Sequence, residues 1–182
     1  SLARLAHVPS QSSIFCFVVL QYNKVELTEQ CVASLRLLRP GSQRVHIVIV
    51  DNKSNESVIA RTRELFDSSA DVTLLLSESN LGFSSGNNLG YAYARDKLGA
   101  RFVIVLNNDT RIDQGDFIER TLSLFEQWAF SVAGPDVVIA GGRHENPWND
   151  NVYSLDEWKT LHALRSSERQ SYLETGKTSF RK

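Results

Sequence analysis

The 182-residue sequence predicts an α/β fold in which a twisted, mostly parallel sheet is flanked by helices. Short apolar runs rich in β-branched residues alternate with amphipathic segments of about ten to fifteen residues. Polar residues follow directly after each of the first four runs. The first pattern is typical of buried parallel strands joined by helical crossovers. The second places polar groups at the carboxyl edge of the sheet, where ligands bind in such folds.

The elements follow in order from the apolar pattern and its punctuation. Strands are expected at residues 14–22, 45–50, 72–76, 102–106 and 132–139. Helices are expected at residues 28–38, 59–66, 88–98 and 117–128. Pro40-Gly41 ends the first helix and Gly99 closes the third, whereas Gly134-Pro135 interrupts the last strand. The wholly apolar run 102–106 predicts a fully buried strand.

Composition and charge narrow the functional classes. The formal net charge is -1 and the pI is about 6.4, so the sequence lacks the basic footprint of a nucleic-acid-binding protein. Cys16 and Cys31 fall in apolar positions, which predicts two buried core thiols and a reducing compartment. The longest apolar run, residues 14–20, is too short to span a bilayer. We therefore expect a cytoplasmic protein.

The segment Asn107-Asn108-Asp109 follows the fourth strand and is the first candidate for chemistry. A carboxylate beside two amides suits a hard divalent cation that keeps water ligands and binds substrate phosphates. The alternative is an ordinary turn, because Asn and Asp favour turns after strands. This segment alone does not decide between the two.

Two further segments lie at neighbouring strand ends. Asp51 ends the second strand and could accept a hydrogen bond from a base or a ribose; alternatively Asp51, Asn52 or Ser54 caps the next helix. After the third strand, residues 80–90 are rich in Gly and Asn, which lets backbone approach a ligand closely or simply marks a loop.

Taken together and in order, these segments resemble family 2 glycosyltransferases. The resemblance rests on residues 17–23, 49–54, 80–90 and 105–110 and on Gly134-Pro135, and it extends over roughly residues 14–142. It is similar to the nucleotide-sugar-binding half of that family's GT-A fold, particularly in rhamnosyltransferase-like bacterial members. The resemblance implies a glycosyltransferase that moves a sugar from a UDP- or dTDP-sugar to a glycan or lipid-linked acceptor, in surface polysaccharide assembly and with inversion.

The resemblance also assigns roles to individual residues. It implies that Tyr22 and Asn23 line the nucleotide pocket and that Asp51 binds the base. Asn107-Asn108-Asp109 stands where the family has its Asp-x-Asp motif, so Asp109 would hold Mg²⁺ or Mn²⁺ against the diphosphate, with one charge fewer because Asn107 replaces the first Asp. The wall around the donor would be formed by Gly82, Phe83, Gly86 and Asn88.

The sequence departs from the family pattern after Gly142. Residues 1–142 are expected to form the nucleotide-sugar-binding domain and 143–182 a peripheral loop and charged helical arm. No acidic motif there matches the family's catalytic base, so the acceptor half is expected to be missing from this chain. Basic residues of the tail, such as Arg165 and Arg169, permit peripheral contact with the inner face of a membrane.

Two alternatives remain open from the sequence. One is a catalytically incomplete module or fragment that binds nucleotide-sugar without transferring it. The other is a sugar nucleotidyltransferase, although the segment Gln21-Tyr22-Asn23-Lys24 after the first strand lacks the glycine-rich loop expected of such enzymes.

Overall fold

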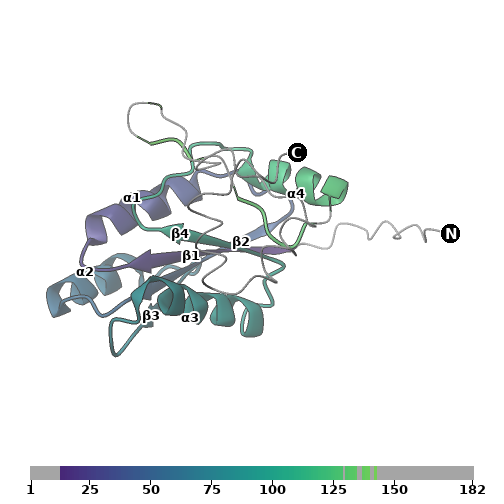
Figure 1. The fold of residues 1–182 in the computed structure, drawn as a ribbon. Coiled ribbons are helices and arrows are strands. Elements are labelled where there is room, and N and C mark those ends of the chain that lie inside the picture. Colours follow the sequence, from purple (N-terminus) through teal and green to yellow (C-terminus); the bar gives the residue numbers. More distant parts are fainter. Residues whose placement is uncertain (1–12, 129, 135–136, 140–141, 143–182) are drawn as a thin grey trace, which may run out of the picture. The chain divides into compact units, whose positions relative to one another are not determined.

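A computed structural model describes residues 13–128, 130–134, 137–139 and 142 of the chain. The elements alternate regularly between strand and helix (Figure 1). They are β1 (Ile14–Gln21), α1 (Val25–Arg36), β2 (Arg44–Asp51), α2 (Glu56–Phe66), β3 (Val72–Leu76), α3 (Gly82–Asp96), β4 (Phe102–Asn107) and α4 (Phe117–Trp128). This alternation confirms the predicted α/β class.

The four strands form one parallel sheet in the order β3-β2-β1-β4. β1 therefore lies in the interior of the sheet, between β2 and β4. Its residues Phe15 to Val19 are fully buried, as expected for a strand that is apolar on both faces. In Figure 1 the arrowheads of β1 and β4 point the same way, so their carboxyl ends lie at one edge of the sheet.

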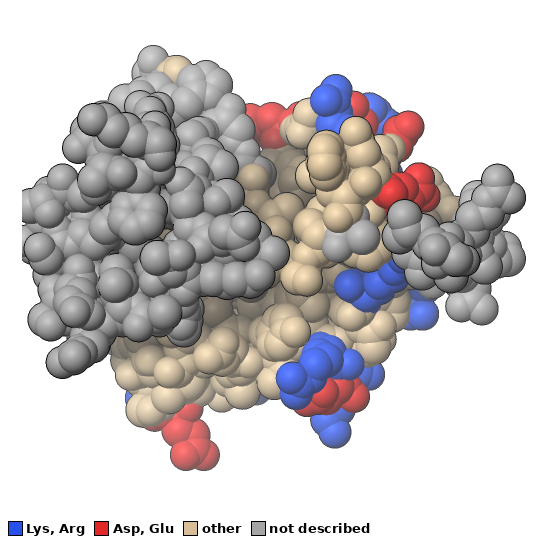
Figure 2. Space-filling view, turned by 45° about the vertical axis from the view of Figure 1, so that its right-hand side comes forward, with Lys and Arg blue, Asp and Glu red and all other residues tan. Residues whose placement is uncertain are grey.

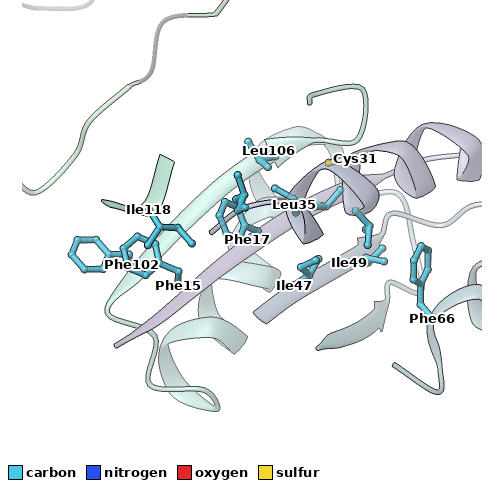
Figure 3. Packing of buried hydrophobic residues seen from close by; sticks show 13 residues of the cluster. Phe15, Phe17, Cys31, Leu35, Ile47, Ile49, Phe66, Phe102, Leu106 and Ile118 are labelled. Carbon is cyan, nitrogen blue, oxygen red and sulfur yellow. The ribbon is translucent and has the colours of Figure 1, made fainter. Parts of the chain in front are cut away.

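Two apolar clusters cover the two faces of the sheet. Side chains of β1 alternate between them, because successive residues of a strand point to opposite faces. The larger cluster packs α1, α2 and α4 against one face, with Phe15 stacked on Phe102 at a centroid distance of 4.5 Å (Figure 3). The smaller cluster lies on the other face, beneath α3, and contains Cys16, Val18 and Ala94. The helices thus fix the sheet from both sides.

Both cysteines are free and buried in these clusters, which confirms their prediction as core residues. Burial raises the pKa of the Cys16 and Cys31 thiols to about 12. Because the thiolate is the reactive form, neither thiol is suited to redox or nucleophilic chemistry at neutral pH.

Strand 72–76 and helix 117–128 have the predicted bounds, whereas the third helix does not. α3 begins at Gly82, six residues before the predicted start at Asn88, so the glycine-rich segment is helical from Gly82 onward and only Asn80 and Leu81 stay in a loop. Glycine disfavours helix intrinsically. Here tertiary packing prevails: a Cβ at Gly90 would overlap the Val18 side chain and lie 2.9 Å from Val50 Cγ2.

Two strand predictions are wrong. β4 is not fully buried, because Val105 is 44% exposed and, among the described residues, β4 pairs only with β1. Residues 132–139 form no fifth strand: their described part contains one isolated bridge residue, Val138. Val132 is 89% exposed and Val138 56% exposed, so these side chains are not buried as those of an interior strand would be.

The chain divides into two compact units, residues 1–129 and 130–182. All eight elements named above belong to the first unit. In the second, Gly142 N–H donates to Ile139 O at 3.0 Å. The predicted domain boundary at residue 142 stays a prediction, and the predicted arm 143–182, with its basic tail, lies outside the described residues.

Charged side chains on the first unit are mixed in sign. Figure 2 brings forward the side of the sheet opposite the strand tips, and there basic and acidic groups lie next to one another. Arg36 pairs with Asp71 at 2.9 Å and Arg95 with Asp96 at 2.6 Å. Within the described ranges, none of the helices has the length and apolar character needed to cross a bilayer.

Candidate functional site

The carboxyl ends of three strands meet at one edge of the sheet. Asp51 of β2 is in register with Gln21 of β1, and Asn107 of β4 is in register with Leu20. Because β1 lies between β2 and β4, the two outer tips are about 10 Å apart, which is two strand spacings. The sequence prediction that these tips share an edge is confirmed.

Asp51 is buried at the tip of β2 and its carboxylate is held by the protein itself. Only 1% of Asp51 is exposed. Its Oδ2 accepts a hydrogen bond from Gln21 Nε2 at 2.8 Å, and its Oδ1 accepts one from the Ser54 backbone N–H at 2.7 Å. Through its hydrogen bond to Gln21, Asp51 links the tips of β1 and β2, and we call the linked group of Asp51 and Gln21 the buried bracket. The contact of Asp51 with a base stays a prediction.

The alternative of helix capping at this tip is wrong. The N-cap of α2 is Asn55, which makes no side-chain cap bond. Asp51 instead closes the short turn to Ser54, in which Lys53 has a positive φ of 70°. A left-handed lysine is uncommon and costs backbone energy, and such strain concentrates at functional sites.

Gln21 extends the bracket into α2 and was missed by the sequence analysis. It is fully buried, and its Nε2 also donates to Thr62 Oγ1 at 2.9 Å. Thr62 Oγ1 in turn donates to Val58 O at 2.8 Å. The sequence does hold a signal for this role, because Gln21 is the polar residue that ends an otherwise apolar strand. A buried amide at such a place needs hydrogen-bond partners from neighbouring elements.

Tyr22 and Asn23 follow β1, and only Asn23 has a side chain that is hydrogen-bonded to the described part of the protein. The Tyr22 side chain is 50% exposed at the edge. Asn23 has a φ of 55°, its N–H donates to Ser54 Oγ at 2.8 Å, and its Oδ1 accepts the Asn55 N–H at 2.8 Å. Asn tolerates the left-handed conformation better than most residues. Asn23 thus ties the β1 tip to the β2 tip and leaves Tyr22 projecting.

The loop after β3 is held by Asn52, which is 4% exposed. The Asn52 side chain bonds to each of the three consecutive residues Asn80, Leu81 and Gly82. Gly82 has a φ of 71°, a conformation that glycine adopts without strain. Phe83, in the first turn of α3, is 60% exposed. Gly82 and Phe83 therefore begin α3 directly after a loop that is anchored to the β2 tip.

Gly86 and the two asparagines after it lie on α3. A Cβ at Gly86 would lie 2.7 Å from Leu20 Cδ1, so this glycine lets the helix approach the β1 tip. Asn88 is exposed. Asn87 is 6% exposed, and neither polar atom of its side chain has a hydrogen-bond partner among the described residues. Such orphaned buried groups are rare in native proteins and mark places where water or a ligand reaches.

The β4 tip forms the turn that the alternative interpretation predicted, and it also exposes the Asp109 carboxylate, whose role as a metal ligand stays a prediction. Thr110 N–H donates to Asn107 O at 3.1 Å. The Asn108 amide donates to Lys24 O at 2.9 Å and to Thr28 Oγ1 at 3.1 Å, which ties the turn to the start of α1. Asp109 is exposed, and its charge contributes, after burial, to raising the pKa of Cys31.

The predicted site residues therefore fall into two sets. Three have side chains bonded into the scaffold: Asn23, Asp51 and Asn108. The side chains of a second set are exposed and make no hydrogen bond within the described part of the chain: Tyr22, Asn88, Asn107 and Asp109. The first set fixes the edge, and the second is available to a ligand. Gly82, Phe83 and Gly86 lie in the first turns of α3, and their part in a wall around the donor stays a prediction.

A shallow depression of the described surface lies elsewhere, over α4. Its lining includes Asp116 and Arg120, which form an ion pair at 2.8 Å. Because these charges neutralise each other and no strand tip reaches the depression, we do not assign the site to it.

A family model for glycosyl transferase family 2 matches residues 16–180, which is most of the chain. The chain belongs to glycosyl transferase family 2. This membership confirms the resemblance seen in the sequence and does not favour the sugar nucleotidyltransferase alternative.

The chain is also similar to proteins of known name and to solved structures. The low-salt glycan biosynthesis hexosyltransferase Agl10 of Haloferax volcanii is 31% identical over 95 residues, which are 52% of this chain and 29% of Agl10. The crystal structure of S. aureus TarS 1-349 superposes with a TM-score of 0.53 and 16% identity, over 71% of this chain and 43% of that one. Its complex with UDP-GlcNAc gives 0.53 and 15%, over 71% and 41%.

These likenesses confirm the GT-A fold of this family 2 chain. The chain spans less than half the length of the relatives it matches.

Proposed function

We propose that the carboxyl edge of the sheet binds a nucleotide-sugar, and that the protein transfers the sugar to a glycan or lipid-linked acceptor. The carrying observation is the exposed pair Asn107 and Asp109 on a tip that Asn108 ties to α1. A preorganised frame with free polar groups is what binding a charged ligand requires. The complex of TarS with UDP-GlcNAc, a protein of the same fold, supports a UDP-sugar or the related dTDP-sugar as donor.

Within this proposal each predicted residue has its own role toward the donor. Tyr22 offers an aromatic surface to the nucleotide beside Asn23. Gly82, Phe83, Gly86 and Asn88 form the wall on the α3 side. A direct contact between Asp51 and the base would require a ligand to share a carboxylate that Gln21 and Ser54 already hold.

The described residues fit a divalent cation bound jointly with the donor diphosphate. No group of three or more His, Cys, Asp or Glu side chains among them could hold a metal. Mg²⁺ and Mn²⁺ typically keep several waters and bind one or two carboxylates plus substrate phosphates. We propose that Asp109 supplies the carboxylate and Asn107 an amide oxygen. When bound, the cation would offset the negative charge of the leaving diphosphate.

The proposed transfer is inverting. The acceptor oxygen bonds to the anomeric carbon, the bond from that carbon to the diphosphate oxygen breaks, and a carboxylate takes the acceptor proton. We assign no described residue as this base. The two buried cysteines support a reducing, cytoplasmic location, with peripheral membrane contact where the acceptor is lipid-linked.

Calorimetric titration tests the proposal. UDP-GlcNAc and a dTDP-sugar are titrated into the 182-residue chain with and without Mn²⁺, and then into Asp109→Ala and Asp113→Ala. Asp113 is an exposed acid four residues away. We expect Mn²⁺-dependent binding that Asp109→Ala weakens by about tenfold or more, equivalent to about 1.4 kcal/mol, whereas Asp113→Ala binds like the parent. Equal loss in both variants, or binding indifferent to Mn²⁺, would contradict it.

A further inference from the structure

Asn52 occupies an unusual position one residue beyond β2. Its backbone N–H donates to Gln21 O at 2.9 Å and so continues the β1–β2 ladder. Its side chain is buried near Gly86, where an added Cβ would lie 3.6 Å from Asn52 Cγ. The residue is therefore fixed to the sheet on its backbone side and reaches toward α3 with its amide.

This side-chain amide acts both as a hydrogen-bond acceptor and as a donor. Oδ1 accepts the Leu81 backbone N–H at 2.8 Å, while Nδ2 donates to Asn80 Oδ1 at 3.1 Å and to Gly82 O at 3.2 Å. A backbone N–H can only donate and a carbonyl can only accept, so the loop itself dictates which end of the amide faces which partner. An ionised Asp here would place one carboxylate oxygen against two acceptor oxygens, Asn80 Oδ1 and Gly82 O, so the site favours Asn over Asp.

This amide is the anchor of the loop. Among the described residues, every hydrogen bond from Asn80, Leu81 and Gly82 to the sheet edge goes to Asn52. The loop is otherwise exposed, and Asn80 bonds within it to the Gly82 N–H at 2.9 Å. Gly82, which this amide holds, and the exposed Phe83 after it are the first two residues of the wall assigned to the donor.

We propose that Asn52 is a positioning residue of the donor site. Its amide sets the position of residues 80–82, and with them the wall that begins at Gly82, without touching the donor itself. This inference rests on the proposed function, since the position of the wall matters only if a donor binds against it.

The test compares Asn52→Ala and Asn52→Asp with the matched change Asn55→Asp. The Asn55 side chain makes no cap bond, and Asn and Asp serve equally well at an N-cap, so Asn55→Asp is expected to behave like the parent. For each chain we measure amide hydrogen exchange at Leu81 and Gly82 without ligand, affinity for UDP-GlcNAc with Mn²⁺, and urea unfolding. Asn80→Ala, an exposed change in the same loop, serves if an Asn52 variant does not fold.

We expect exchange at Leu81 and Gly82 to rise about tenfold or more in both Asn52 variants, because the loop opens locally at a smaller free-energy cost. UDP-GlcNAc affinity should fall by about tenfold or more, and combining Asn52→Ala with Asn80→Ala should lose less affinity than the sum of the two, since both act through one loop.

Three results would overturn the proposal. Affinity that falls while exchange stays unchanged would mean that Asn52 touches the donor directly. Faster exchange with unchanged affinity would mean that the loop position does not matter to the donor. Additive losses in the double variant would separate Asn52 from the loop. If instead the parent chain binds no donor, the proposed function fails, whereas the exchange data still report whether Asn52 holds the loop.

Discussion

Asp109 and Asn107 differ from the polar residues around them because their side chains are not bonded to the described protein. Asn23, Asp51 and Asn108 lie at the same edge, but their side chains form hydrogen bonds to other groups of the protein. One exposed carboxylate is a weak ligand set for a divalent cation, because such cations need several oxygens. Metal binding should therefore depend on the diphosphate.

This dependence gives a prediction about order of binding. The Mn²⁺ electron paramagnetic resonance signal should be unaffected by the chain alone and should fall when UDP is added to the mixture. Asp109→Ala should reduce the UDP-dependent loss of signal to that seen with UDP and no protein, and Asp113→Ala should preserve the full loss. Tight Mn²⁺ binding without UDP would instead reveal a protein-only metal site and refute this account of Asp109.

The buried bracket at Gln21 makes a stability prediction. Thr62→Val removes the hydroxyl that accepts a hydrogen bond from Gln21 Nε2, so one of the two N–H groups of this buried amide loses its partner while the other still donates to Asp51. The free energy of unfolding should fall by about 1–3 kcal/mol, the usual cost of orphaning a buried polar group. Thr62→Ser keeps the hydroxyl and should retain most of the stability. Urea unfolding measures both, and equal losses would show that the methyl group, not the hydrogen bond, matters.

At the scale of elements, α3 shows what local sequence cannot reveal. The pattern predicted its existence but placed its start six residues too late, because Gly82 and Gly86 read as loop residues. Their role is visible only once the helix lies on the sheet, where Gly86 and Gly90 allow the backbone to approach Leu20 and Val18. Propensity is local, whereas this close approach is tertiary.

Gly90→Ala tests that packing. Alanine favours helix over glycine by up to about 1 kcal/mol, so an exposed site would gain stability. At Gly90 the added methyl group meets Val18 and Val50, and we expect a net loss of about 1–3 kcal/mol in urea unfolding. Ser85→Ala, an exposed change in the same helix, should cost little. A Gly90→Ala chain as stable as the parent would mean that α3 packs less closely than the structure indicates.

The pairing of β2 with β3 makes stability sensitive to pH. His46 contacts Thr73 Oγ1 at 2.9 Å, and burial lowers its pKa from the usual 6.5, an effect that Asp71 opposes and Arg44 supports. Below pH 6.5 the unfolded chain therefore binds more protons than the folded one. Stability contributed by neutral His46 should be present above pH 6.5 and lost as the pH falls toward the lowered pKa.

His46→Gln should remove this component. Urea unfolding at several pH values would show a shallower dependence below pH 6.5 in the variant than in the parent. The pKa of Asp71 is lowered by its hydrogen bond to Arg36, so its contribution is lost only in more acid solution, below the usual value of 3.8. The two windows are separable, and an unchanged dependence in His46→Gln would contradict the assignment.

For the whole molecule, the sequence predicted the parallel sheet and the shared edge of its tips, because apolar runs and the polar residues after them report both directly. It did not predict which polar side chains at that edge are bonded to the protein and which are exposed. Whether an Asn or Asp faces the scaffold or the solvent depends on contacts between segments about thirty to eighty residues apart, such as Asn52 with Leu81 and Asn108 with Thr28. Gln21 and Thr62 were missed for this reason, and Asn52 was considered only as a possible helix cap.

The central claim is that a metal-bound diphosphate sits at the carboxyl edge of the sheet, and paramagnetic broadening by Mn²⁺ tests it most directly. With UDP present, substoichiometric Mn²⁺ should broaden the backbone amide signals of residues 22–23, 52–54 and 107–110. Signals at the opposite edge, such as Ser13, Gln43 and Ala100, should stay sharp. Broadening centred on that opposite edge or on α4, or none at the tips, would contradict the account.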